Sequence, residues 1–161
     1  MEQKYSERFR KPRVSWDEYF MKIAEIVSER TTCLRLRGGA VVVKDKRIIA
    51  TGYNGSARGL PHCSQVGCLK DHLELKGIPR GTGHESCRAI HAEENAILQC
   101  ALHGISSDGA TMYATVSPCL ACAKSIINAG IKRVVYRSDY DDDAAFALFK
   151  EAGVGIEKLE E

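Results

Sequence analysis

Apolar residues recur along the first third of the chain at two different spacings. Over 14–30 they follow helical intervals, and Ser15 with Glu18 forms a capping box at the start of that segment. Over 38–53 ("GGAVVVKDKRIIATGY") two β-branched runs flank a polar turn at 44–46. The pattern therefore predicts an N-terminal helix followed by a β-hairpin.

The second half of the chain alternates between helical and strand patterns. Helices are predicted at 87–103, 118–129 and 143–152, and strands at 110–116, 132–137 and 154–159. A glycine follows each predicted helix, as is common at helix ends. This alternation predicts an α/β domain.

Residues 54–87 are rich in glycine and polar residues and only weakly periodic. A loop of this length inside a compact domain is uncommon unless it is functional or held by cross-links. The segment contains three Cys and three His, which could supply that anchoring. We therefore expect a single domain over 1–161, with an N-terminal helix at 14–30, a Cys/His-rich insertion at 54–87 and a metal-binding catalytic core at 88–125.

The composition is that of an ordinary globular protein, with 44% hydrophobic and 27% charged residues. No apolar run approaches the roughly 18 residues needed to cross a bilayer, and the polar N-terminus lacks a secretory signal pattern. A cytoplasmic protein without membrane contact is the expectation. A net charge of +2 gives no general support for nucleic-acid binding. The seven cysteines, an odd number in an expected reducing compartment, favour metal binding over disulfides.

Cys119 and Cys122 lie three residues apart in the predicted first turn of a helix. This spacing puts both sulfurs on one face, and a helix N-terminus favours the thiolate form that binds metal. His91, in "AIHAEENAI", is the natural third ligand. Two sulfurs and one imidazole make a zinc site with one position open, as catalytic zinc requires. A closed site with a fourth protein ligand is the structural alternative.

Glu93 lies two residues after His91 and has a chemical use beside such a metal. Zinc lowers the pKa of bound water, and a carboxylate beside that water can take its proton and pass it to a substrate. On an ideal helix the two side chains point about 200° apart. Both can reach one site only if the metal lies above the start of the helix. A closed zinc site would leave Glu93 without a role.

Three stretches of the chain resemble the cytidine and deoxycytidylate deaminase superfamily. They are "TTCLRLRGGAVVVKDKRIIATGYNGSARGLPHC", "HAEENAIL" and "ATMYATVSPCLACAKSIINAGIKRVVY", and the resemblance runs from about Ser15 to Tyr140. The His-x-Glu and Pro-Cys-x-x-Cys motifs are the known signature of zinc nucleobase deaminases. The segment "GYNGSARG" and the Cys-rich insertion resemble the deoxycytidylate (dCMP) branch. The resemblance implies a three-layer α-β-α fold, with helices flanking a central mixed sheet of about five strands.

In chemical terms the resemblance implies zinc-dependent hydrolysis of dCMP to dUMP and ammonia, which feeds dTMP synthesis. His91, Cys119 and Cys122 would hold zinc, the activated water would attack C4 of cytosine, and Glu93 would shuttle protons. Other superfamily activities stay open, namely deamination of free cytidine or deoxycytidine, of tRNA adenosine, or of a riboflavin-pathway pyrimidine. A non-catalytic zinc scaffold protein is an alternative from another class.

Substrate contacts are expected partly from the resemblance and partly from residue chemistry. The resemblance implies that Asn54 contacts the sugar, the backbone at Ala92 the base edge, and Tyr140 the phosphate. Asn54 and the glycine after it would also favour a plain turn. Arg35 and Arg37 alternate in a segment expected to be extended, so they should point the same way, and arginine suits a bidentate phosphate contact. The expected substrate-binding residues are Asn54, Ala92, Arg35, Arg37, Arg58, Ser117 and Tyr140.

Some dCMP deaminases carry a second, structural zinc, and the resemblance implies ligands for it in and near the insertion. The expected set is Cys33, Cys63, His84 and Cys87. Cys68 and His62 compete for the fourth place, so the set stays open. Free buried thiols are the alternative.

The dCMP branch contains regulated hexamers that dCTP activates and dTTP inhibits. In them an arginine commonly lies eleven residues after the metal-binding His, whereas this chain has Leu102 there. We therefore expect a homo-oligomer, a hexamer by resemblance, with dCTP and dTTP only as candidate effectors.

Overall fold

A mixed five-stranded sheet forms the middle of the molecule. The computed structural model describes residues 12–75, 77, 87–140 and 142–160. The strands are β1 (Gly39–Lys44), β2 (Arg47–Tyr53), β5 (Thr111–Val116), β6 (Arg133–Ser138) and β7 (Gly155–Lys158). Their order is β2-β1-β5-β6-β7, with β1 antiparallel to both of its neighbours and β5, β6 and β7 parallel. The expected mixed sheet is confirmed.

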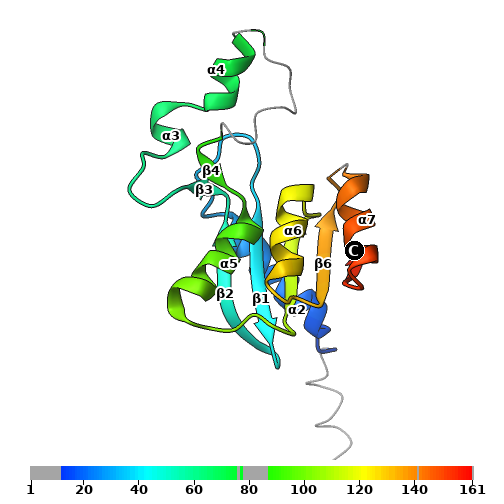
Figure 1. Ribbon diagram of the computed structural model, residues 1–161. Coiled ribbons are helices and arrows are strands. Elements are labelled where there is room, and N and C mark those ends of the chain that lie inside the picture. The colour runs from blue at the N-terminus through cyan, green and yellow to red at the C-terminus, as the bar shows by residue number, and fades with distance from the viewer. Residues whose placement is uncertain (1–11, 76, 78–86, 141, 161) are drawn as a thin grey trace, which may run out of the picture.

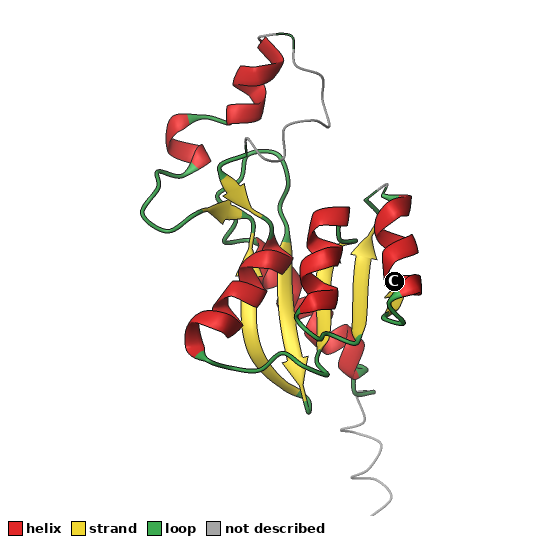
Figure 2. Cartoon of the chain, viewed as in Figure 1, coloured by secondary structure: helices red, strands yellow, loops and turns green. Residues whose placement is uncertain are grey.

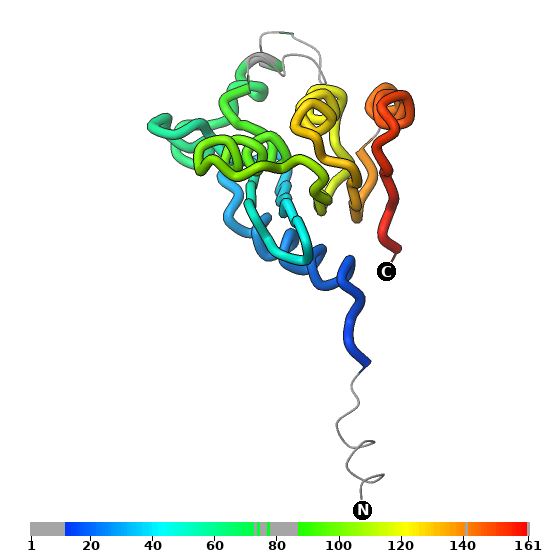
Figure 3. The backbone as a smooth tube through the Cα atoms, turned by 60° about the horizontal axis from the view of Figure 1, so that its bottom comes forward, coloured from blue at the N-terminus to red at the C-terminus, as the bar shows by residue number. Residues whose placement is uncertain are grey.

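Helices cover both faces of this sheet. Helix α2 (Trp16–Ser28) lies on one face, and α5 (Ala92–His103), α6 (Leu120–Asn128) and α7 (Asp143–Glu151) lie side by side on the other (Figure 3). Two separate clusters of buried residues fill the spaces between these layers. The chain therefore has the expected three-layer α-β-α arrangement.

Strand β1 shows how the sequence places the two cores. Ala40 and Val42 belong to the cluster under α5, α6 and α7, whereas Val41 and Val43 belong to the cluster under α2. Successive strand residues point to opposite faces, so an unbroken apolar run is the pattern of a strand buried on both sides.

Two glycines let helices approach the sheet closely. A Cβ atom on Gly39 would lie 2.2 Å from the Ala24 carbonyl oxygen of α2, and one on Gly52 would lie 2.2 Å from the Ala92 carbonyl oxygen of α5. Any side chain at either position would push a helix off the sheet. Gly52 therefore lets the first turn of α5, which follows His91, pack directly on β2.

The helix predicted at 87–103 begins later than its pattern suggests. Residues 89–90 form β4 (Ala89–Ile90), which pairs with β3 (Gly55–Ser56) as a two-stranded ribbon, and α5 starts only at Ala92. His91 is its N-cap, with an extended backbone at φ −68° and ψ 154°. Periodicity could not show this start, because the pairing partner lies more than thirty residues earlier in the chain.

The insertion is more ordered than its sequence suggested. It contains two short helices, α3 (Cys63–Val66) and α4 (Leu69–Leu75), which extend beyond the end of the main sheet near β3 and β4 (Figures 1 and 2). The other elements agree with the predicted ranges to within a few residues. In the described ranges, no helix has the length and apolar character to cross a bilayer.

Two arginines on β6 tie α2 to the sheet. Arg133 donates two hydrogen bonds to Asp17, at 2.7 and 2.8 Å, and Tyr113 donates a third at 2.6 Å. Hydrogen bonding to Arg133 lowers the pKa of the Asp17 carboxyl. These contacts hold the first turn of α2 against the middle of the sheet.

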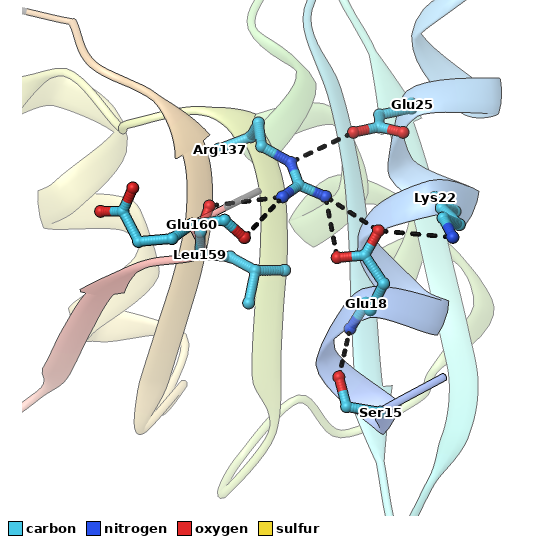
Figure 4. Close-up of polar contacts among 7 residues, drawn as sticks. All are labelled: Ser15, Glu18, Lys22, Glu25, Arg137, Leu159 and Glu160. Carbon is cyan, nitrogen blue, oxygen red and sulfur yellow. Dashed lines mark hydrogen bonds and ion pairs between the residues drawn. The ribbon is translucent and has the colours of Figure 1, made fainter. Parts of the chain in front are cut away.

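Arg137 makes the second attachment, shown in Figure 4. Its Nη2 donates to both Glu18 oxygens at 3.1 and 3.2 Å, and its Nε donates to Glu25 at 3.3 Å. Its Nη1 donates to the backbone carbonyls of Leu159 and Glu160. Only 17% of the Arg137 side chain is exposed, so a single guanidinium joins α2, β6 and the C-terminal segment.

We expect Arg137→Met to lower the free energy of unfolding by about 1–2 kcal/mol, because hydrogen bonds to charged partners are lost while the apolar stem remains. Urea denaturation followed by circular dichroism measures this. Lys132→Met, at an exposed neighbouring position, is the matched control and should change stability by less than about 0.5 kcal/mol. Equal effects from the two substitutions would contradict the role given to Arg137.

Candidate active site

A cavity of about 220 Å³ opens where α5 and α6 begin. Its walls come from the end of β5, the starts of the two helices, the segment before β1 and the insertion. In α/β folds, ligands bind at the carboxyl ends of parallel strands, and this cavity borders that end of β5. The sequence elements predicted to carry chemistry therefore meet at the expected edge of the sheet.

Three candidate metal ligands come together at the edge of this cavity, which His91 and Cys119 line. The His91 Nδ1 atom lies 3.5 Å from Cys119 Sγ and 3.4 Å from Cys122 Sγ. All three ligand atoms lie within 4.8 Å of one another, and among the described residues no other group of Cys, His, Asp or Glu is gathered in this way. His91 is the N-cap of α5 and Cys119 the N-cap of α6, so two helix starts face one point.

This geometry fits zinc. Tetrahedral zinc with Zn–S bonds of about 2.3 Å and Zn–N bonds of about 2.0 Å keeps its nitrogen and sulfur ligands about 3.5 Å apart. Both observed N–S distances match that value. The donor set of one imidazole and two thiols would leave one of four zinc positions open, as a catalytic zinc requires.

The surroundings favour one thiolate before any metal binds. The Cys122 thiol, followed by His91 and the start of α6, holds the pKa of Cys119 at about 3, although burial opposes this. The hydrogen bond to Cys119 in turn raises the pKa of His91. Proximity to Cys119 and burial raise the pKa of Cys122. A metal at this point would therefore displace the Cys122 proton as it binds.

Glu93 lies in the first turn of α5 and is only 8% exposed. Because His91 precedes the helix instead of lying within it, both side chains reach the cavity, which removes the 200° difficulty of an ideal helix. Burial raises the pKa of the Glu93 carboxyl above its ordinary value. A carboxyl with a raised pKa beside three metal ligands is the arrangement expected of a residue that moves protons.

Asn54 fixes the start of α5 from across the cavity. Its Oδ1 accepts from the Ala92 N–H at 2.7 Å, and its Nδ2 donates to the Leu36 carbonyl at 3.1 Å. Asn54 is 4% exposed and lines the cavity together with Ala92. The Ala92 N–H, expected to meet the base edge, is thus already bonded to Asn54 in this structure.

Ser117 and Tyr140 form another part of the wall. The Ser117 hydroxyl accepts from the Tyr140 N–H at 2.6 Å and donates to the Tyr140 carbonyl at 3.2 Å. Ser117 is 3% exposed, so these bonds close the gap between the β5–α6 and β6–α7 connections. Both residues, which the sequence predicts to contact substrate, line the cavity.

Comparison with known proteins agrees with this geometry. Residues 14–138 match the family described as the cytidine and deoxycytidylate deaminase zinc-binding region. The chain belongs to this family. It is therefore a deaminase, an enzyme of the hydrolase class.

Individual relatives support the assignment. The deaminase is 48% identical over 151 residues to ComE operon protein 2 of Bacillus subtilis, covering 92% of this chain and 73% of that one. It is 39% identical over 148 residues to deoxycytidylate deaminase of Saccharomyces cerevisiae, covering 91% of this chain but only 46% of that longer protein. The crystal structure of dCMP deaminase from cyanophage S-TIM5, in complex with dCMP and dUMP, aligns with a TM-score of 0.72 at 33% identity, covering 88% of this chain and 95% of that chain.

The three arginines expected to bind phosphate differ in whether they line the cavity of the deaminase. Arg35 lines the cavity, but Arg37 and Arg58 are exposed and do not. The segment that holds Arg35 and Arg37 is irregular rather than a strand, so alternation does not align the two. Lys70 and Arg88, which carry no recognisable sequence signal, also line the cavity.

Four thiols of the deaminase face the same cavity from the side of the insertion. They are Cys33, Cys63, Cys68 and Cys87. His84 lies outside the described residues, and the competing His62 is exposed and does not line the cavity. The described thiols are not gathered as closely as the three ligands around His91.

We expect Cys119→Ala to reduce the bound zinc by one ion per chain, because one of the three ligands at this position is lost. Inductively coupled plasma mass spectrometry of the purified, dialysed protein measures the zinc content per chain. Cys100→Ala is the control, since Cys100 is a buried thiol in the core under α5 and contacts no ligand. Retention of the full zinc content by Cys119→Ala would rule out this ligand set.

Proposed function

We propose that the deaminase hydrolyses dCMP to dUMP and ammonia, a product that would feed dTMP synthesis. The observation that carries the proposal is Glu93, buried in a ligand-sized cavity beside His91, Cys119 and Cys122. The relatives named deoxycytidylate deaminase, and the neighbour with dCMP and dUMP bound, support the choice of substrate.

The buried carboxylate has a defined task in this reaction. Zinc bound by the three ligands would lower the pKa of a water molecule towards neutrality. Glu93 is placed to take a proton from that water and to deliver it to the amino nitrogen of cytosine. Oxygen adds at C4, the C4–N bond breaks and ammonia leaves, so one water and one dCMP give one dUMP and one ammonia. A scaffold protein would have no use for a buried carboxylate at this point.

Asn54 and Ser117 shape the space in which the base would lie. Each is buried and held by two or more hydrogen bonds to the backbone of another segment. Such fixed polar walls hold a substrate in one orientation without being reorganised as it binds. Asn54 therefore supports the start of α5 directly, and any contact it makes with the sugar would use its remaining hydrogen-bonding capacity.

A structural zinc in the insertion is a further part of the proposal. Cys33, Cys63 and Cys87 line one side of the cavity, and a fourth ligand from the insertion would draw them together around a metal. Zinc analysis of Cys63→Ser tests this, because loss of one ion beyond the catalytic zinc is expected. An unchanged zinc content would leave these residues as free thiols.

Assembly into a homo-oligomer stays a prediction from family resemblance. The outer face of α5 leaves Leu98 46% and Leu102 56% exposed, with Ile105 40% exposed just beyond the helix. A contiguous apolar surface of this kind is typical of a protein contact. Light scattering with and without dCTP or dTTP would give both the mass and any effector response, and a monomeric mass would refute the hexamer.

We expect Glu93→Gln to lower kcat for dCMP by at least about 10³-fold, because the amide keeps the shape but cannot accept and return a proton. Zinc content and melting temperature should stay close to those of the wild type. Glu94→Gln, at the exposed neighbouring position, is the control and should retain activity. A Glu93→Gln variant with near-normal turnover would refute the mechanism.

A further inference from the structure

The cavity walls of the described chain carry three cationic side chains besides the histidine, namely Arg35, Lys70 and Arg88. A nucleotide brings a phosphate with up to two negative charges into this space. The cation that meets the phosphate should be the one whose hydrogen-bonding capacity is not already used by the protein. The contacts of the three residues separate them on this criterion.

Two of the three guanidinium nitrogens of Arg35 are already engaged by carboxylates. Its Nε and Nη2 donate to Asp71 Oδ1 at 2.9 and 2.7 Å, and Nη2 also donates to Glu74. Hydrogen bonds to these two carboxylates raise the pKa of Arg35. Its charge is thus more than balanced, and its evident role is to hold α4 against the segment before β1. A phosphate beside Arg35 would be repelled by these two carboxylates.

Lys70 belongs to the same helix, α4, and takes part in an interaction of its own. Lysine also presents a single point charge instead of the planar fork that matches a phosphate edge. It can add positive charge to the cavity, but it offers no fixed geometry for recognition.

Arg88 differs from both. Its Nε atom is buried, and within the described part of the chain it has no hydrogen-bond partner. A buried guanidinium nitrogen without a partner is costly, and such groups in native proteins call for an explanation through function. The Nε–H and a neighbouring Nη–H form the edge that pairs with two oxygens of one phosphate.

The position of Arg88 also suits a mononucleotide. It comes directly before β4, which the β3 pairing holds beside Asn54, and it lies three residues before His91. Three extended residues span about 10 Å. In a nucleotide the amino group of the base and the 5′-phosphate lie at opposite ends. The base would lie at the His91 end of this segment, which leaves the phosphate for the Arg88 end.

We propose that Arg88 binds the 5′-phosphate of the substrate and so makes the deaminase selective for a nucleotide over a nucleoside. This inference rests on the proposed cytosine deamination and adds the residue that selects the phosphorylated substrate. Arg35, by contrast, holds α4 against the segment before β1.

The test compares kcat/KM for dCMP and deoxycytidine in zinc-loaded wild type, Arg88→Met and Arg88→Lys. Arg88→Met should lower kcat/KM for dCMP about 100-fold, mainly through KM, because a charge-assisted bidentate contact is lost. The value for deoxycytidine should change by less than about twofold, since that substrate has no phosphate to lose. Arg88→Lys should recover part of the dCMP activity, because lysine keeps the positive charge but lacks the planar pair of N–H donors that guanidinium offers.

Arg47→Met is the matched control, because Arg47 is an exposed arginine at the far end of β2, where the hairpin turns. It should leave both substrates unaffected. If Arg88→Met keeps the dCMP preference, or loses both substrates equally, the assignment is wrong. If Arg88→Met does not fold, Arg88→Lys alone decides, since it should lose dCMP activity selectively.

A binding measurement separates this proposal from the proposed reaction. The melting temperature of the wild type should rise with dUMP, whereas that of Arg88→Met should not, because a ligand stabilises only a protein that binds it. Without ligand, Arg88→Met should melt no lower than the wild type, since it removes an unsatisfied buried nitrogen. An inactive wild type that dUMP still stabilises through Arg88 would refute the reaction and leave the phosphate site intact. A dUMP shift that survives Arg88→Met would refute the site.

Discussion

The convergence of two helix starts on one point is the constraint on which the rest of this structure depends. Tetrahedral zinc needs its nitrogen and sulfur ligands about 3.5 Å apart, and here the candidate ligands His91 and Cys119 lie 28 residues apart in the chain. Helix α5 is positioned by its close approach to Gly52 and by the hydrogen bond from the Ala92 N–H to Asn54. The segment before α6 is positioned by the hydrogen bonds between Ser117 and Tyr140. The contacts that hold α5 and α6 in place therefore also bring the candidate metal ligands together.

How far the sequence predicted this fold depends on how local each feature is. The hairpin and the strands at 110–116, 132–137 and 154–159 were predicted from patterns that a run of six residues already contains. The start of α5 was not, because it is set by β3–β4 pairing between segments more than thirty residues apart. The two short helices of the insertion were missed for a similar reason. Segments of four and seven residues carry too little periodicity to be recognised.

The candidate site divides in the same way. The spacing of Cys119 and Cys122 is a local rule of helix geometry, so it predicted neighbouring sulfurs correctly. Which cations line the cavity depends on where the insertion lies, which no local rule contains. Arg35 is paired with Asp71 and Glu74, which lie 36 and 39 residues away, and an arginine at position 88 has no sequence feature that marks it. What distinguishes Arg88 is a buried atom that has no partner among residues 12–75, 77, 87–140 and 142–160, which only the folded structure reveals.

Charge balance gives these two arginines their different roles. With Asp71 and Glu74 around it, the Arg35 group carries one net negative charge, which would repel a phosphate instead of attracting it. Arg35 lines the proposed substrate cavity, so the attraction for a phosphate would have to come from another cation. In a partly buried cavity the interaction between unbalanced charges is screened less than at the surface. In the proposed site, Arg88, whose buried Nε has no partner among the described residues, would therefore discriminate a phosphate from a hydroxyl more strongly than solvent-exposed arginines such as Arg37 and Arg58.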